Sequence, residues 1–108
     1  MIRIPLADIP CPGTYEIEGA SANRPGLFIV RHPQGINAYR NSCPHTGAPL
    51  NWQPNQFLND AGLIQCSLHG ALFLPSNGLC IQGPCRNQTL TEVPVMIEGE
   101  ELIIEATR

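Results

Sequence analysis

The sequence predicts an all-β protein, a small antiparallel β sandwich or barrel that forms one domain over residues 1–108. Short runs rich in β-branched and aromatic residues recur along the chain, and most are bounded by Pro, Gly or Asn, as strands are. Eleven Pro and ten Gly among 108 residues indicate a turn-rich chain of short elements. No window of about twelve residues has helical periodicity without Pro or Gly inside it.

The expected strands form an N-terminal group and a C-terminal group. Four runs predict the first group: Ile2–Ile4, Thr14–Ile17, Gly26–Val30 and Ile36–Tyr39. Two runs predict the second group, Leu90–Ile97 and Glu101–Glu105. We expect two hairpins, which turn at His32–Gly35 and at Glu98–Glu100.

The segment between these groups, Asn41 to Arg86, departs from the pattern. It carries four of the five cysteines and two of the three histidines, and its clearest candidate strands are only Leu63–Gln65 and Ala71–Phe73. A loop-rich insert with little core of its own needs a support, and a metal centre is the usual one. We therefore expect β sheets at about 1–40 and 87–108, and a metal-binding subdomain at about 41–86.

Charge and composition exclude several classes of protein. A net charge of −3 argues against nucleic acid as a partner, and no run approaches the roughly 20 apolar residues of a membrane span. The N-terminus has no signal-peptide pattern, so we expect a reducing cytoplasm, where an odd number of cysteines indicates metal ligands or thiols. A Ser-His-Asp set, a phosphate loop and a dinucleotide fingerprint are missing, so we do not expect an enzyme.

Two short motifs could hold a metal. Cys43-Pro44-His45 and Cys66-Ser67-Leu68-His69 supply two thiolates and two imidazoles, and a glycine after each pair lets the backbone turn tightly. Zinc also accepts two Cys and two His, although zinc sites favour Cys-x-x-Cys or His-x3-5-His pairs. The residues leave both a zinc site and an iron–sulfur cluster open.

This pair of motifs resembles the signature of the Rieske iron–sulfur family. The resemblance implies a Rieske domain with one [2Fe–2S] cluster per chain, in which Cys43 and Cys66 hold one iron and His45 and His69 hold the other. It also implies that Gly83-Pro84-Cys85 forms the family's proline-bearing loop, which covers the cluster. The gap between the motifs is longer than is common, through the stretch Trp52–Asp60.

The same resemblance implies a low reduction potential. High-potential members carry a disulfide between the ligand loops and Ser and Tyr hydroxyls that bond to sulfur, whereas Ala71 and Phe73 stand where those hydroxyls are expected. We expect a potential near the low end of the Rieske range, roughly −150 mV. Replacing two thiolates by neutral imidazoles removes negative charge from the core, and the outer edges of His45 and His69 become the natural port for the electron.

Other conspicuous residues receive simpler interpretations. We expect Cys80 to fill an apolar slot, Cys85 to pack near the sulfides, and Cys11 to have no role. His32 is interpreted as a solvated turn residue. Trp52 and Phe57 are expected to form the core of the long loop, with partner docking as the alternative. The acidic residues Glu92, Glu98, Glu100, Glu101 and Glu105 are expected to form a solvated edge, with a steering surface for a basic partner as the alternative.

The function expected from the resemblance is that of a ferredoxin. It carries one electron from a flavin-dependent reductase to a terminal oxygenase, as a monomer with no nucleic acid or membrane partner. Pro44, Leu68 and Pro84 would form a small docking patch. Two alternatives stay open, the small subunit of an assimilatory nitrite reductase bound to a larger reductase subunit, and a redox or cluster sensor that uses Cys80 and Cys85.

Overall fold

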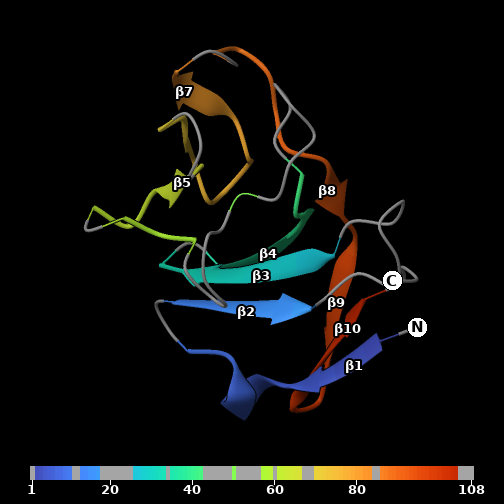
Figure 1. The fold of residues 1–108 in the computed structure, drawn as a ribbon. Coiled ribbons are helices and arrows are strands. Elements are labelled where there is room, and N and C mark those ends of the chain that lie inside the picture. Colours follow the sequence, from blue (N-terminus) through green and yellow to red (C-terminus); the bar gives the residue numbers. More distant parts are fainter. Residues whose placement is uncertain are drawn as a thin grey trace.

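The chain folds into short antiparallel strands (Figure 1). The computed structural model describes residues 2–10, 13–17, 26–33, 35–42, 50, 57–59, 61–66, 70–83 and 86–104. Its strands are β1 (Ile2–Pro5), β2 (Gly13–Ile17), β3 (Leu27–His32), β4 (Gly35–Arg40), β5 (Ile64–Gln65), β6 (Leu72–Phe73), β7 (Cys80–Gln82), β8 (Glu92–Val93), β9 (Val95–Glu98) and β10 (Glu101–Ile104), with one 3-10 helix at Leu6–Asp8. The predicted all-β class is confirmed. None of the helical residues described belongs to a helix long and apolar enough to cross a membrane.

The strands form three sheets. Their orders are β1-β10-β9, β2-β3-β4-β8 and β5-β6-β7, and neighbouring strands among the described residues pair antiparallel. In Figure 1 the four-stranded sheet lies between the sheet of β5 and β7 and the sheet of β1, β9 and β10. The molecule therefore has a middle layer with a core on each side.

Strand β3 shows why the middle layer needs apolar residues on both faces. Four consecutive residues, Leu27 to Val30, are completely buried. Because side chains alternate along a strand, Phe28 and Val30 enter one core, and Leu27 and Ile29 enter the other. A continuous apolar run of this kind is typical of a strand covered on both faces.

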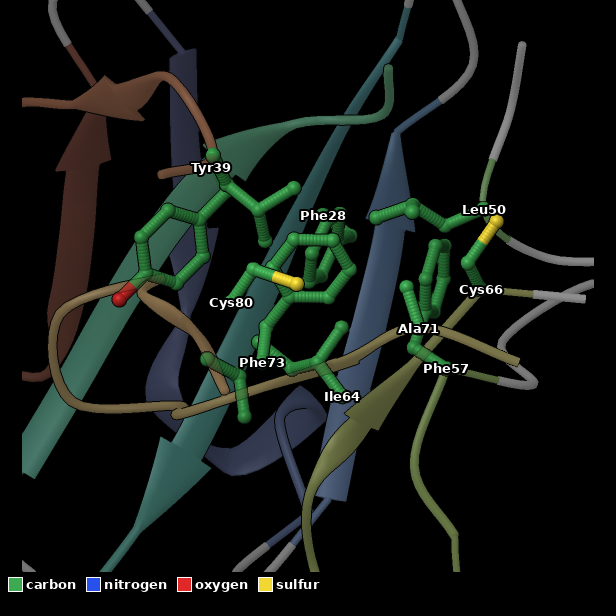
Figure 2. Packing of buried hydrophobic residues seen from close by; sticks show 11 residues of the cluster. Phe28, Tyr39, Leu50, Phe57, Ile64, Cys66, Ala71, Phe73 and Cys80 are labelled. Atoms are coloured by element: carbon green, nitrogen blue, oxygen red, sulfur yellow. The ribbon is translucent and has the colours of Figure 1, made fainter. Parts of the chain in front are cut away.

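The two cores contain different parts of the chain. The core beside β1 and β10 contains only residues of the terminal segments and the middle sheet: Ile4, Ile9, Ile17, Leu27, Ile29, Ala38, Val93, Leu102 and Ile104. The other core joins the middle sheet to the insert and contains Phe28, Val30, Tyr39, Leu50, Phe57, Ile64, Cys66, Ala71, Phe73, Cys80 and Leu90 (Figure 2). Apolar packing against the middle sheet therefore holds the insert, in addition to the metal centre that the sequence predicts.

Both predicted hairpins are confirmed, but one predicted strand is wrong. His32 pairs with Gly35 at the first turn, and Glu98 pairs with Glu101 at the second. The expected strand Leu90–Ile97 is divided at Pro94 into β8, in the middle sheet, and β9, at the edge of another sheet. Proline has no N–H for a sheet ladder, so the chain changes sheets at this residue.

The insert contains one strand that the sequence did not predict. β5 and β6 fall within the expected runs, whereas β7 lies between Gly78 and Gly83, both with positive φ, and is only three residues long. Its pairing partner is β6, with Phe73 opposite Cys80. The sequence did not predict β7 because the glycines on either side of it usually mark turns.

Tyr39 of β4 attaches the insert to the middle sheet. Its buried hydroxyl donates a 2.7 Å hydrogen bond to the carbonyl of Pro75, in the turn between β6 and β7. Gly78 in the same turn has φ +72°, and a Cβ there would lie 2.9 Å from Cε1 of Tyr39. The Tyr39 ring and this turn therefore fit against each other without spare room.

Replacing Tyr39 by Phe is expected to lower the free energy of unfolding by about 1 kcal/mol, because the Pro75 carbonyl loses its buried donor. Burial, and then the negative charge of Glu92, raise the pKa of Tyr39 above its ordinary value. The folded state therefore favours the neutral phenol. Its contribution to stability is complete below the unfolded pKa of about 10 and is lost as pH rises through the higher folded pKa.

Urea unfolding measured from neutral to alkaline pH tests this prediction. The parent protein should lose more stability above pH about 10 than Y39F does. Tyr15, a half-buried residue of β2, provides the matched Tyr→Phe control. Equal losses of stability in Y39F and Y15F would contradict a special role of the Tyr39 hydroxyl.

Candidate metal centre

The second Cys/His motif lies in the segment that connects β5 to β6. Cys66 is fully buried, and its N–H donates a 2.8 Å hydrogen bond to the carbonyl of Ala71. The N–H of Gly70 donates to the Cys66 carbonyl at 3.0 Å, with Gly70 at φ +67°. Ser67 to His69 lie outside the described residues, but the residues on either side of them are bonded to each other, and these bonds fix the backbone that carries the Cys66 thiol.

Asn41, which precedes the first Cys/His motif, is bonded to Leu50, which follows it. Its side-chain Oδ1 accepts a 2.7 Å hydrogen bond from the N–H of Leu50, and its own N–H donates to the Gly26 carbonyl at 2.8 Å. Asn41 is only 6% exposed, so water competes little for these bonds. Cys43 and His45 lie outside the described residues, but the residues that flank their loop are joined directly.

The two loops meet at one end of the insert core. Leu50, which follows the first motif, and Cys66, which begins the second, are both completely buried and belong to the same cluster. Figure 2 shows Leu50 beside Cys66, with Ala71 and Phe57 next to them and Tyr39 at the opposite end of the cluster. The fold therefore places the described residue that follows the first motif beside the described cysteine of the second.

The expected cover loop begins at a point of close backbone contact. Gly83, directly after β7, has φ +112°, and a Cβ there would lie 2.7 Å from Cα of Ala71 and 2.9 Å from its Cβ. Only glycine permits this approach of β7 to the loop of Cys66. Pro84 and Cys85 lie outside the described residues, so their role as a cover stays a prediction, but the segment that precedes them is at the second motif.

The other described cysteine occupies an apolar site, as predicted. Cys80 is 1% exposed within the insert core, and its Sγ donates a 3.3 Å hydrogen bond to the Gln82 carbonyl. Figure 2 shows Cys80 among Phe28, Phe73 and Tyr39, well apart from Cys66. Cys11 lies outside the described residues. Within the parts of the chain described, no three His, Cys, Asp or Glu side chains form a metal site. Three of the four predicted ligands, Cys43, His45 and His69, lie outside those parts.

The two core residues that stand where hydroxyls were considered are apolar. Ala71 and Phe73 are both completely buried. Phe57 is also part of this core, where its ring stacks on Phe28 with 4.3 Å between the centroids. The structural interpretation of Phe57 is therefore confirmed, and it packs on the middle sheet; Trp52 lies outside the described residues. A buried thiolate in this setting is shielded from water.

The interpretation of His32 as a solvated residue is wrong. It is 7% exposed, and its Nε2 lies 2.6 Å from Oδ1 of Asn37. The amide of Asn37 donates to Glu92 at 2.8 Å, so its oxygen accepts from His32, whose Nε2 carries the proton. The hairpin shields this histidine because it is the last residue of β3, inside the sheet.

The acidic C-terminal stretch is exposed, as expected, but it is not uniform. Glu101 lies 3.5 Å from Arg3, and Glu92 accepts the bond from Asn37. Glu98 and Glu100 are exposed at the end of the β9–β10 hairpin, and Glu105 lies outside the described residues. The prediction of a solvated edge is therefore supported for the described members.

Sequence reasoning named two residues that position the loops but missed what they contact. Asn41 was noted only as the start of the insert, although an amide two residues before Cys43 is a suitable clamp for the loop that follows. The contact of Gly83 with Ala71 joins residues far apart in the chain, and the glycine itself was the available signal.

Comparisons with known proteins agree with this arrangement. Residues 6–97 match the family model of the Rieske [2Fe-2S] domain. The chain is 26% identical over 101 residues to the 3-phenylpropionate/cinnamic acid dioxygenase ferredoxin subunit of Shigella boydii serotype 4 (strain Sb227), across 94% of this chain and 88% of that one.

Solved structures share the fold. The ferredoxin of carbazole 1,9a-dioxygenase from Nocardioides aromaticivorans IC177 matches with a TM-score of 0.71 at 21% identity, across 95% of this chain and 94% of that one. A chain in the complex of reduced oxygenase and oxidized ferredoxin in carbazole 1,9a-dioxygenase matches with a TM-score of 0.71 at 20% identity, across 95% and 92%. At these identities the structural likeness establishes the fold.

Proposed function

Because this chain belongs to the Rieske [2Fe-2S] domain family, we propose that it is a one-electron carrier that receives electrons from a flavin-dependent reductase and delivers them to a terminal oxygenase. The observation that carries the proposal is the family match over residues 6–97, which includes both Cys/His motifs. The relative from Shigella boydii is named as the ferredoxin subunit of a dioxygenase, and one matching structure is a complex of an oxygenase with its ferredoxin.

We propose that Cys43, His45, Cys66 and His69 hold the [2Fe–2S] cluster, with the two thiolates on one iron and the two imidazoles on the other. The structure supports this donor set at the described member, because Cys66 is buried at the point where the two loops meet. Two soft thiolates and two imidazoles suit this cluster. When bound, it accepts and releases one electron, while Asn41, Gly70 and Gly83 position the surrounding loops.

The remaining expectations also stand as proposals. We propose that residues 1–108 form one domain, with base sheets at about 1–40 and 87–108 and a cluster-binding part at about 41–86. The core that joins the insert to the middle sheet supports one unit, because residues of both parts share it. We further propose that the protein acts as a monomer in the cytoplasm.

The direct test is spectroscopic. The purified protein should be red-brown, contain iron and acid-labile sulfide in equal amounts, and give an EPR signal with average g below about 2 after reduction. Electron transfer should then be followed from a flavin reductase through the protein to an oxygenase component. A colourless protein that contains zinc would refute the proposal.

The potential should rise if a hydroxyl is placed beside the ligand loop. A71S adds a donor at a fully buried residue whose carbonyl bonds to the N–H of Cys66. A hydrogen bond that stabilises the reduced sulfur by about 1–2 kcal/mol corresponds to a rise of about 40–90 mV for one electron. Redox titration followed by EPR measures it, starting from a parent potential of roughly −150 mV.

A38S is the matched control for A71S, since Ala38 is a fully buried alanine in the other core. It should leave the midpoint potential unchanged. A parent midpoint above zero would contradict the low-potential assignment, and equal shifts in A38S and A71S would contradict a local effect.

A further inference from the structure

One edge of the β1-β10-β9 sheet exposes apolar side chains. Met96 is 48% exposed and Ile97 is 57% exposed, and they are two of the three large apolar side chains that are exposed among the described residues. Both belong to β9, which has a neighbouring strand on one side only within the described part of the chain. In Figure 1 this sheet lies on the other side of the middle sheet from β5 and β7. The edge is therefore separate from the insert.

The hydrogen bonds of β10 alternate between its two neighbours. The N–H of Leu6 donates to the carbonyl of Glu100 at 2.9 Å. This bond continues the β1–β10 register, in which Ile4 pairs with Leu102. Because successive residues of a strand direct their backbone groups to opposite sides, Leu102 bonds to β1 and Ile103 bonds to β9.

The same alternation leaves two residues of β9 with outward-facing backbone groups. Met96 pairs with Ile103 and bonds into the sheet, so Val95 and Ile97 on either side of it direct their N–H and C=O groups away from β10. No backbone hydrogen bond reaches this side of β9 from any described residue. A further strand, antiparallel to β9, could form about four backbone hydrogen bonds here.

The opposite edge of the sheet is protected against such pairing. Since Ile4 and Leu6 bond to β10, the outward-facing residues of β1 are Arg3 and Pro5, a charged residue and one that has no N–H. Charged residues and proline are the usual means by which edge strands avoid further pairing. The outward-facing positions of β9 hold neither, so β9 is the open edge of this sheet.

The charge around the open edge is negative. Glu98 and Glu100 are exposed at the end of β9, whereas the carboxylate of Glu101 lies 3.5 Å from Arg3. Arg31 also borders the hairpin, but its guanidinium donates to two backbone carbonyls of the N-terminal segment. A second copy of this chain would bring another net charge of −3 to this edge. A basic partner is therefore the complementary one.

We propose that β9 is a docking edge for an extended segment of another protein in which apolar and basic residues alternate, and that this segment joins the sheet as an antiparallel strand. Its apolar side chains cover Val95 and Ile97 on one face of the sheet. On the other face its basic side chains lie opposite Met96 and Glu98, with their aliphatic stems on Met96 and a positive charge beside Glu98. The inference goes beyond the proposed function, because the cluster takes no part in it.

Short capped peptides of about eight residues test the proposal on the purified holoprotein. Valine and lysine alternate in the first peptide, and valine and glutamate alternate in the second. Fluorescence anisotropy of the labelled peptides measures both dissociation constants at low salt. We expect the valine–glutamate peptide to bind at least about tenfold more weakly than the valine–lysine peptide. Absence of binding by the valine–lysine peptide would refute the proposal.

Two N-methylated forms of the valine–lysine peptide test whether it binds as a strand. Its valines lie opposite Val95 and Ile97 in the antiparallel pair and supply the bonds to β9, so methylation of the valine nitrogens should weaken binding at least about tenfold. The lysine nitrogens face away from β9, and their methylation should change the dissociation constant by less than about threefold. Equal binding of the two forms would mean that charge alone holds the peptide, and the proposal would fail.

Two variants place the added strand on β9. I97P removes an outward-facing N–H and no bond to β10, so the valine–lysine peptide should bind at least about fivefold more weakly. R3P removes an outward-facing N–H at the other edge and should bind the peptide within about twofold of the parent protein. Equal weakening in I97P and R3P would contradict the assignment to β9.

Amide hydrogen exchange of the parent protein gives the same assignment without a variant, should I97P fail to fold. The bound valine–lysine peptide should slow exchange of the Val95 and Ile97 N–H groups and leave those of Met96 and Glu98 unchanged. Uniform slowing along β9, or none, would overturn the proposal. Sedimentation without peptide examines the alternative occupant: a dimer of the parent protein that I97P abolishes would identify the partner as a second copy of this chain and would also overturn it.

Discussion

C66A should contain no [2Fe–2S] cluster, whereas C80A should retain a full one. The two cysteines are equally buried, at 0% and 1% exposure, and both belong to the insert core. Of these two cysteines, Cys66 belongs to a Cys/His motif and lies beside Leu50, which follows the other motif. We therefore expect only C66A to lose the visible absorption and the bound iron and sulfide. Metal and sulfide analysis of both purified variants measures the outcome.

C80A also measures how much a buried thiol that is not a ligand contributes to the free energy of unfolding. It removes the bond from Sγ to the Gln82 carbonyl and leaves a small cavity, so the free energy of unfolding should fall by about 1 kcal/mol. Loss of the cluster in C80A, or its retention in C66A, would require a different set of ligands. A zinc content in the parent that disappears in C66A would indicate the structural zinc site instead.

Local patterns were sufficient to predict most of the fold. The runs Thr14–Ile17 and Ile36–Tyr39 became strands because alternation and β-branching act within the segment itself. The two hairpin turns were also local, since each lies between strands that pair directly. The four apolar residues of β3 predicted a strand. Both of its faces are buried because the middle sheet has a core on each side.

Features that depend on distant residues could not be predicted. Pro94 was visible in the sequence, yet the chain's transfer from the middle sheet to the edge of another depends on what each sheet already contains. His32 was misjudged because it bonds to Asn37 across the hairpin, and Asn37 in turn bonds to Glu92, 55 residues further along the chain. β7 pairs with β6, and its first residue, Cys80, also bonds to Asn87 and Gln88, whereas its own three residues carry little signal.

The candidate site divides in the same way. The spacing of the two Cys/His motifs predicts the donor set without any fold, because ligand chemistry depends on the residues themselves. The meeting of the loops depends on Asn41 with Leu50 and on Gly83 with Ala71. In each contact one partner is a specific residue, the side chain of Asn41 or the missing side chain of Gly83, and the other partner is a main-chain atom, which every residue type has. The sequence therefore shows the Asn and the Gly but does not show what they contact.

Gly83→Ala is expected to lower the free energy of unfolding by about 2–4 kcal/mol, by two separate effects. Alanine at φ +112° is strained, and its Cβ would lie 2.7 Å from a backbone atom of Ala71, which cannot move without opening the loop of Cys66. Gly99→Ala separates these effects, because Gly99 has φ +63° and nothing within 4 Å of a Cβ. G99A should cost about 1 kcal/mol, from backbone strain alone.

The two variants should also differ in cluster retention. Displacing residue 83 moves the start of the proposed cover away from the ligand loop, so an iron chelator should bleach G83A several-fold faster than the parent protein, and G99A at the parent rate. Urea unfolding and the rate of bleaching are measured on the same preparations. If G83A and G99A lose equal stability and bleach equally fast, the contact between Gly83 and Ala71 does not hold the cover in place, and backbone strain accounts for both variants.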